Sequence, residues 1–161
     1  MKRIMAHWSE DAAFHYSPRT APRSVLRRIA NPSLAAALLF RIAASERPLT
    51  RFLARWLLLT TFSCDVSPGA RFAGPIDLPH PVGIVIGKGA SFGSRVRLFQ
   101  NVTVGSSRRG EYPNLGNDVT VYSNAVIAGR VTISDHAVIG ANATVTRDVS
   151  AQVVVRAAQT R

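Results

Sequence analysis

Apolar residues recur at every sixth position through the second half of the chain. Large aliphatic residues occupy this position six times in succession: Leu115, Val121, Ile127, Ile133, Ile139 and Val145. A small or β-branched residue stands four positions after each of them: Val119, Ala125, Val131, Ala137, Ala143 and Val149. An α-helix repeats every 3.6 residues and a simple strand every 2, so neither produces this spacing. A period of six indicates a repeat protein.

The same period extends toward the middle of the chain, through the residues Val66, Phe72, Leu78, Ile86, Phe92, Leu98 and Val104. Six residues suit one flat face of a prism, with a short strand followed by a corner. Three units, about 18 residues, would complete one turn, and parallel backbone hydrogen bonds would stack the turns. Glycine, asparagine, aspartate and serine fill the intervening positions, as corners require. The pattern therefore predicts a mainly β protein, with a parallel β-helix over residues 63–161.

The register of the repeat is interrupted twice. From Leu78 to Ile86 the interval is eight residues, and from Val104 to Leu115 it is eleven. Insertions in a solenoid emerge as surface loops, and such loops either simply tolerate extra residues or carry binding groups.

Residues before the repeat have a helical composition. Asn31 is a suitable N-cap for a helix over Pro32–Ala44, and Pro48 ends that helix. Apolar residues at helical spacing predict a second helix over Leu49–Thr60. Residues 1–30 are rich in arginine and punctuated by proline, so we expect them to be partly extended.

The length of 161 residues fits one fold with a helical N-terminal segment, residues 1–62, attached to the β-helix. The formal charge of +11 favours anionic partners, although arginine supplies most of it and can also reflect a genomic habit. Aromatic residues are few and do not alternate with the basic ones, which argues against nucleic-acid binding.

Cys64 is the only cysteine, so we expect no disulfide and assign it a buried packing role. The apolar runs before residue 62 are too short and too often interrupted by charge to span a bilayer. The first residues lack the pattern of a secretory signal, so we expect none. These features predict a cytoplasmic protein without a membrane span.

The first insertion holds the strongest chemical signal, because His80 stands between two prolines. Pro79 and Pro81 restrict the backbone on both sides. A neutral imidazole can take a proton from a hydroxyl, which makes His80 a candidate general base, although an isolated histidine is more often structural. The remaining histidines have no comparable setting: His7, His15 and His136.

From Cys64 onward the chain resembles the hexapeptide-repeat acyltransferases, and within them the serine O-acetyltransferase branch. The resemblance rests on four segments: Asp65–Ala70, His80–Gly87, Gln100–Gly105 and Tyr112–Gly116. It implies a left-handed β-helix, an acyl transfer reaction with acetyl-CoA as co-substrate and no metal, and a homotrimer or a dimer of trimers.

The resemblance also assigns roles to residues. It makes His80 the general base and Asp65, fifteen residues upstream, the group that orients it. It places coenzyme A in a groove between neighbouring β-helices, along the residues Gly105, Ser123, Asn124, Ala125 and Ala141. Arg108, Arg109 and Arg147 are candidate phosphate contacts in the same region.

Departures from the family pattern concern the acceptor. Pro79 stands where serine acetyltransferases usually carry an aspartate, and Glu111 and Tyr112 stand where they carry Arg-His. These three are the candidate substrate-binding residues. L-Serine is the leading acceptor, and a sugar of a surface polysaccharide or a specialised metabolite is the alternative.

Two other classes of function remain open. A hexapeptide-repeat metal enzyme would need histidines that project from adjacent coils, but only His80 and His136 lie in the repeat. A non-catalytic β-helix that serves as a scaffold subunit is the other class, and retention of Asp65 with His80 argues against it.

Overall fold

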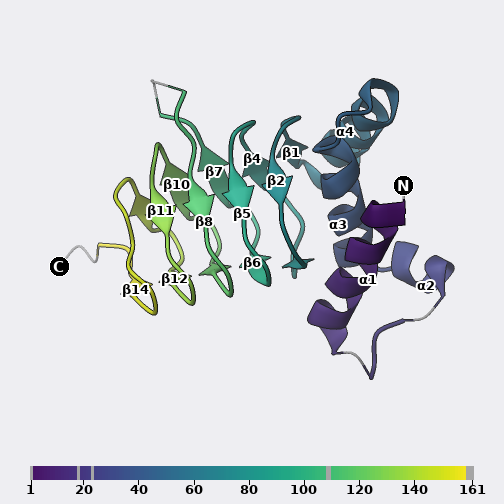
Figure 1. Ribbon diagram of the computed structural model, residues 1–161, viewed down its shortest axis with the longest axis horizontal. Coiled ribbons are helices and arrows are strands. Elements are labelled where there is room, and N and C mark those ends of the chain that lie inside the picture. Colours follow the sequence, from purple (N-terminus) through teal and green to yellow (C-terminus); the bar gives the residue numbers. More distant parts are fainter. Residues whose placement is uncertain (1, 18, 23, 108–109, 159–161) are drawn as a thin grey trace.

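The computed structural model describes the chain except for residues 1, 18, 23, 108–109 and 159–161. Helices gather at one end of the molecule, and short strands stack behind them into a three-sided prism (Figure 1). Within the described residues, none of the helices combines the length and apolar character needed to cross a membrane.

The described residues of the helical segment form four helices: α1 (Lys2–Tyr16), α2 (Val25–Ile29), α3 (Pro32–Ala43) and α4 (Pro48–Phe62). The predicted start of α3 is confirmed, because the Asn31 side chain accepts a hydrogen bond from the Leu34 N–H at 3.0 Å. Proline occupies the first turn of both α3 and α4, where its missing N–H costs nothing. The two helices predicted from the sequence are therefore present.

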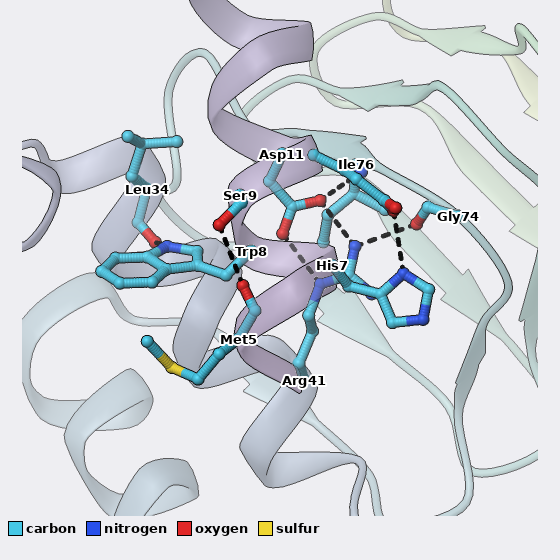
Figure 2. Close-up of polar contacts among 10 residues, drawn as sticks. Met5, His7, Trp8, Ser9, Asp11, Leu34, Arg41, Gly74 and Ile76 are labelled. Atoms are coloured by element: carbon cyan, nitrogen blue, oxygen red, sulfur yellow. Dashed lines mark hydrogen bonds and ion pairs between the residues drawn. The ribbon is translucent and has the colours of Figure 1, made fainter. Parts of the chain in front are cut away.

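The expectation that residues 1–30 are partly extended is wrong for most of the segment, because α1 is a helix of 15 residues and α2 adds five more. The stability of α1 comes from tertiary contacts rather than from its own pattern. Trp8 is fully buried, and its Nε1–H donates to the Leu34 carbonyl oxygen at 2.7 Å (Figure 2). Asp11, one turn further along, forms a buried ion pair with Arg41 of α3 (Figure 2).

The ion pair between Asp11 and Arg41 joins the helices to the first coil of the prism. Arg41 Nε donates to Asp11 at 2.8 Å, and its Nη2 also donates to the Gly74 carbonyl oxygen at 2.9 Å. The Ile76 N–H donates to the same carboxylate at 2.8 Å. Burial raises the pKa of Asp11, and the Arg41 guanidinium opposes that rise. Removal of one partner from a buried pair costs about 3–5 kcal/mol, so this contact fixes α1 and α3 against the prism.

Three parallel sheets form the faces of the prism. Sheet A contains β1 (Asp65–Val66), β4 (Val85–Ile86), β7 (Thr103–Gly105), β10 (Val126–Ala128) and β13 (Thr144–Val145). Sheet B contains β2 (Arg71–Phe72), β5 (Ser91–Phe92), β8 (Asn114–Leu115) and β11 (Thr132–Ile133). Sheet C contains β3 (Ile76–Asp77), β6 (Val96–Leu98), β9 (Thr120–Val121), β12 (Val138–Ile139) and β14 (Val154–Val155).

Strand register confirms both the repeat and its interruptions. Val126 pairs with Thr144, so an uninterrupted turn spans 18 residues. Asp65 pairs with Val85, a turn of 20 residues across the first insertion, and Thr103 pairs with Val126, a turn of 23 across the second. The two and five extra residues leave the stack as loops, and the pairing resumes unchanged beyond them.

The stacked coils form a left-handed parallel β-helix. Every predicted repeat residue from Leu115 to Val149 is buried, and several corners use asparagine or aspartate at positive φ, such as Asn124 at 60° and Asn142 at 60°. One hydrophobic cluster continues from Phe40 and Leu58 of the helices into the prism. The helices therefore close the open end of the solenoid, as a terminal cap must. That residues 1–62 and 63–161 are separate domains stays a prediction.

Candidate active site

The first insertion lies at the corner where the chain passes from sheet C to sheet A. His80 is exposed there, three residues after the end of β3. The base of the loop is fixed by backbone bonds, because the Gly83 N–H donates to Phe62 of α4 at 3.1 Å and the Asn101 N–H donates to Val82 at 2.8 Å. Gly83 has a φ of +68°, which favours glycine. A rigid base thus presents an accessible imidazole.

A column of aromatic rings runs along this corner, and its two members beyond His80 are residues that sequence reasoning missed. The His80 ring lies 6.1 Å from the Phe99 ring, and Phe99 stacks on Tyr122 at 4.9 Å. Phe99 and Tyr122 are 23 residues apart, which is one turn plus the second insertion. Their alignment was therefore available from the sequence once the inserted residues were counted.

Asp65 lies at the same corner in the preceding coil. Its N–H donates to the Ile84 carbonyl oxygen at 2.9 Å, and the adjacent Cys64 thiol contacts the Pro81 carbonyl oxygen at 3.5 Å. The chain that leaves His80 therefore runs beside Cys64 and Asp65. Cys64 is fully buried, as predicted, and burial raises the pKa of its thiol.

The Asp65 carboxylate is held by an arginine that sequence reasoning did not single out. Arg55 Nε donates to Oδ1 at 2.6 Å, and Nη2 donates to Oδ2 at 2.9 Å. Within the part of the chain that the structure describes, no hydrogen bond joins Asp65 to His80. The expected direct contact is absent from this single chain, and the catalytic roles of both residues stay a prediction.

Part of the predicted coenzyme A region lines up above His80. Ser123, Asn124 and Ala141 occupy the same corner in later coils, where the Asn142 N–H donates to the Ser123 carbonyl oxygen at 3.0 Å. Ala125 is fully buried, and its carbonyl oxygen accepts from the Thr103 N–H at 3.0 Å. The Ala125 carbonyl oxygen, which could otherwise bind a ligand, is therefore already used in the backbone hydrogen bonds of the fold.

The other predicted coenzyme A residues lie across sheet A. Gly105 is the last residue of β7, and its carbonyl oxygen accepts from Gly129 at 3.2 Å. Arg147 is exposed two residues after β13, at the same edge of the sheet. Arg108 and Arg109 lie outside the described residues. In a single chain, the residues predicted to bind coenzyme A therefore lie at two opposite edges of sheet A.

The second insertion emerges at the edge between sheets A and B, away from His80. Tyr112 packs over the preceding coil, because a Cβ on Gly87 or Gly89 would lie 2.6 or 2.4 Å from its ring. The Glu111 carbonyl oxygen accepts from the Ser107 N–H at 3.1 Å. Both side chains are half-buried, and within the described part of a single chain neither Glu111 nor the Tyr112 ring contacts His80. Their roles in substrate binding, like that of Pro79, stay predictions.

A groove of about 890 Å³ lies elsewhere, between α1, the end of α3 and sheet B. The residues that line it include none of the predicted site residues. The described residues contain no group of three or more histidines, cysteines or carboxylates that could hold a metal ion.

Comparison with known proteins gives consistent matches. The family model for bacterial transferase hexapeptide (six repeats) matches residues 112–147. A serine acetyltransferase from Helicobacter pylori is 33% identical over 124 residues, covering 73% of this chain and 72% of the relative. A plasmid serine acetyltransferase from Synechococcus elongatus is 33% identical over 109 residues, but the chain spans only 34% of its length.

Solved structures match over nearly the whole chain. The serine acetyltransferase from Neisseria gonorrhoeae in complex with serine has a TM-score of 0.83 at 25% identity, covering 98% of this chain and 68% of that one. Serine acetyltransferase 1 from Entamoeba histolytica in complex with L-cysteine has a TM-score of 0.81 at 28% identity, covering 97% and 64%.

The six-residue coils and the matching family model define a hexapeptide-repeat protein of the bacterial transferase class. The similarity to the Helicobacter pylori serine acetyltransferase, over most of both chains, identifies the family within this class. The chain belongs to the serine acetyltransferase family.

Proposed function

We propose that the protein is an acetyl-CoA-dependent O-acetyltransferase whose leading acceptor is L-serine. The observation that carries the proposal is the exposed His80, which stands on an anchored loop at a corner of the solenoid beside the coil that holds Asp65. Similarity to proteins named serine acetyltransferases supports the reaction class.

In the proposed reaction, the His80 imidazole removes the proton of the acceptor hydroxyl as its oxygen attacks the thioester carbonyl. A free alcohol is a poor nucleophile at neutral pH, so proton removal lowers the barrier. The C–O bond forms, the C–S bond breaks, and the coenzyme A thiolate recovers the proton from the imidazolium. Asp65 orients the ring and stabilises its charged form. No covalent acyl-enzyme is needed.

A homotrimer, or a dimer of such trimers, is part of the proposal. His80 lies at one edge of sheet A, while Gly105, Arg147 and the second insertion lie at the other. A cyclic assembly in which sheet A faces a neighbouring copy brings opposite edges together and completes the site. The outward residues of sheet A after β1 carry no charge, which supports its burial against another copy: Val85, Thr103, Val126 and Thr144.

The acceptor is the less constrained part of the proposal. Pro79, Glu111 and Tyr112 stand where a carboxylate and a cation would bind the two charged groups of serine. An unmatched zwitterion leaves costly unpaired charge. This substitution favours an uncharged hydroxyl acceptor, such as a sugar, as the second candidate.

The test measures thiol release from acetyl-CoA by the purified full chain with L-serine, L-homoserine and a panel of sugars. We expect turnover with L-serine. Turnover with a sugar and not with L-serine would favour the second candidate. Absence of thiol release with every hydroxyl acceptor would contradict the acetyltransferase proposal and favour a scaffold role.

A further inference from the structure

Arg55 makes a specific contact with a carboxylate of the proposed site. Its guanidinium donates two parallel hydrogen bonds to the Asp65 carboxylate oxygens, at 2.6 and 2.9 Å, in the bidentate geometry that arginine forms with carboxylates. Such a bidentate pair fixes the orientation of the carboxylate, whereas a single hydrogen bond leaves it free to turn. The contact therefore determines how Asp65 is presented at the His80 corner.

Asp65 keeps the capacity to bind a further donor. An ionised carboxylate has about four lone-pair sites, and the two hydrogen bonds from Arg55 use two of them. The Asp65 side chain is 29% exposed, so part of the carboxylate stays accessible to a further donor. An imidazole N–H from the neighbouring loop can use one of these sites while the arginine stays in place.

The helix that carries Arg55 also fixes the base of the His80 loop. Ala54 and Leu58, on the inner face of α4, are buried. At the end of the same helix, the Phe62 carbonyl oxygen accepts the Gly83 N–H. One rigid element thus sets the position of the Asp65 carboxylate and of the loop that carries the imidazole.

We infer that Arg55 is a positioning residue of the active site, which holds the Asp65 carboxylate ready to orient His80. This inference rests on the acetyltransferase function proposed above. Arg55 does not touch the substrate in this scheme; it acts through Asp65. Preorganisation by a fixed arginine removes the rotational freedom that Asp65 would otherwise lose during the reaction.

The competing explanation is an ordinary surface ion pair, which contributes about 0–1 kcal/mol to stability and nothing to catalysis. The chain offers a matched control for it. Arg95 forms the same bidentate pair with Asp118, with Nε 2.6 Å from Oδ1. The Arg95 side chain is 52% exposed and the Asp118 side chain is 24% exposed. This pair lies at the corner between sheets B and C, away from His80.

The experiment measures kcat and KM for acetyl-CoA in Arg55→Gln, Arg55→Lys, Asp65→Asn and the double variant Arg55→Gln with Asp65→Asn. We expect Arg55→Gln to lower kcat about tenfold, with KM for acetyl-CoA and the melting temperature nearly unchanged. Arg55→Lys recovers part of the loss. In the Asp65→Asn background, Arg55→Gln has no further effect, because the two residues act as one unit.

Arg95→Gln serves as the control and keeps wild-type kcat. The inference is overturned if Arg55→Gln also keeps wild-type kcat, or if the effects of Arg55→Gln and Asp65→Asn on kcat multiply. A wild-type chain that releases no thiol with any acceptor removes the proposed function, and the inference with it. A wild-type chain that is active while Arg55→Gln is unaffected removes only the inference.

Discussion

At the corners between successive coils, polar side chains accept hydrogen bonds from backbone N–H groups that have no backbone acceptor. Asp135 accepts a hydrogen bond from the Asn117 N–H at 2.7 Å, and Asn117 in turn accepts one from the Ser94 N–H at 2.9 Å. Asp148 accepts from the Thr132 N–H at 2.7 Å. These bonds satisfy N–H groups that the short strands leave without a ladder partner, so the polar corner residues stabilise the stack.

Two corner carboxylates, Asp135 and Asp118, make the stability of the prism depend on pH. Hydrogen bonds from Asn117 lower the pKa of Asp135, and the Arg95 guanidinium lowers the pKa of Asp118, from a usual value of 3.8. A lowered pKa in the folded state stabilises the fold above pH 3.8, and this contribution is lost as the pH falls through that value and below. We expect the melting temperature to be level near neutral pH and to fall in this acidic range.

Circular dichroism at a series of pH values measures this effect. Asp135→Asn and Asp118→Asn should give a shallower acid dependence than the wild-type chain. The change is small, because Asp135 is exposed and the Arg95 partner of Asp118 is 52% exposed. An acid limb of the same slope in both variants would contradict this assignment.

At the scale of elements, α4 is apolar on two opposite faces. Its inner residues pack on the prism, while its outer face carries large residues with exposed fractions between 48% and 80%: Leu49, Phe52, Leu53, Trp56 and Leu59. A large exposed apolar face on a soluble protein marks a surface that packs against a partner. The helix α4 lies at the end of the molecule and contacts β1, the first strand of sheet A, which is the proposed interface between copies (Figure 1).

This outer face gives a test of assembly. We expect the combined substitution Phe52→Glu and Trp56→Glu to shift the mass in solution from about three or six times 17.4 kDa toward 17.4 kDa, because a charge buried in the interface without a partner is costly. Light scattering after size exclusion measures the mass. Leu26→Glu on α2, where the side chain is 81% exposed, is the control and should not change it. A wild-type monomer, or a double variant with unchanged mass, would contradict the proposed assembly.

The elements differ in how far the sequence determines them. The period of six predicted the inward residues and both loops, because each six-residue unit needs one aliphatic and one small residue at fixed positions. The helix over α3 followed from Asn31 and Pro32. By contrast, α1 depends on the burial of Trp8 and on the pairing of Asp11 with Arg41, residues 30 apart, which no local pattern encodes.

For the whole molecule, the candidate site was predictable only where it depends on the repeat. The exposure of His80 followed from an insertion at a corner. The contact of Arg55 with Asp65 did not, because it requires the chain to reverse between α4 and β1. Ser63 makes that reversal at a φ of 53°, with the Cys64 N–H bonded to Leu58 at 3.1 Å.

The two halves of the site also belong to the whole molecule rather than to one coil. His80 and the second insertion lie at opposite edges of sheet A, so a single chain holds each half apart from the other. The large groove beside sheet B contains neither half. In the proposed function, catalysis therefore depends on the His80 imidazole at the outer corner of the solenoid, which a neighbouring copy is proposed to cover.

Steady-state thiol release from acetyl-CoA by His80→Ala, with the acceptor that the wild-type chain uses, tests this dependence most directly. We predict that kcat falls by about 10²–10⁴-fold, because a positioned general base contributes that much. His136→Ala, at an exposed corner of a later coil, should keep wild-type turnover. Full activity in His80→Ala would contradict the account.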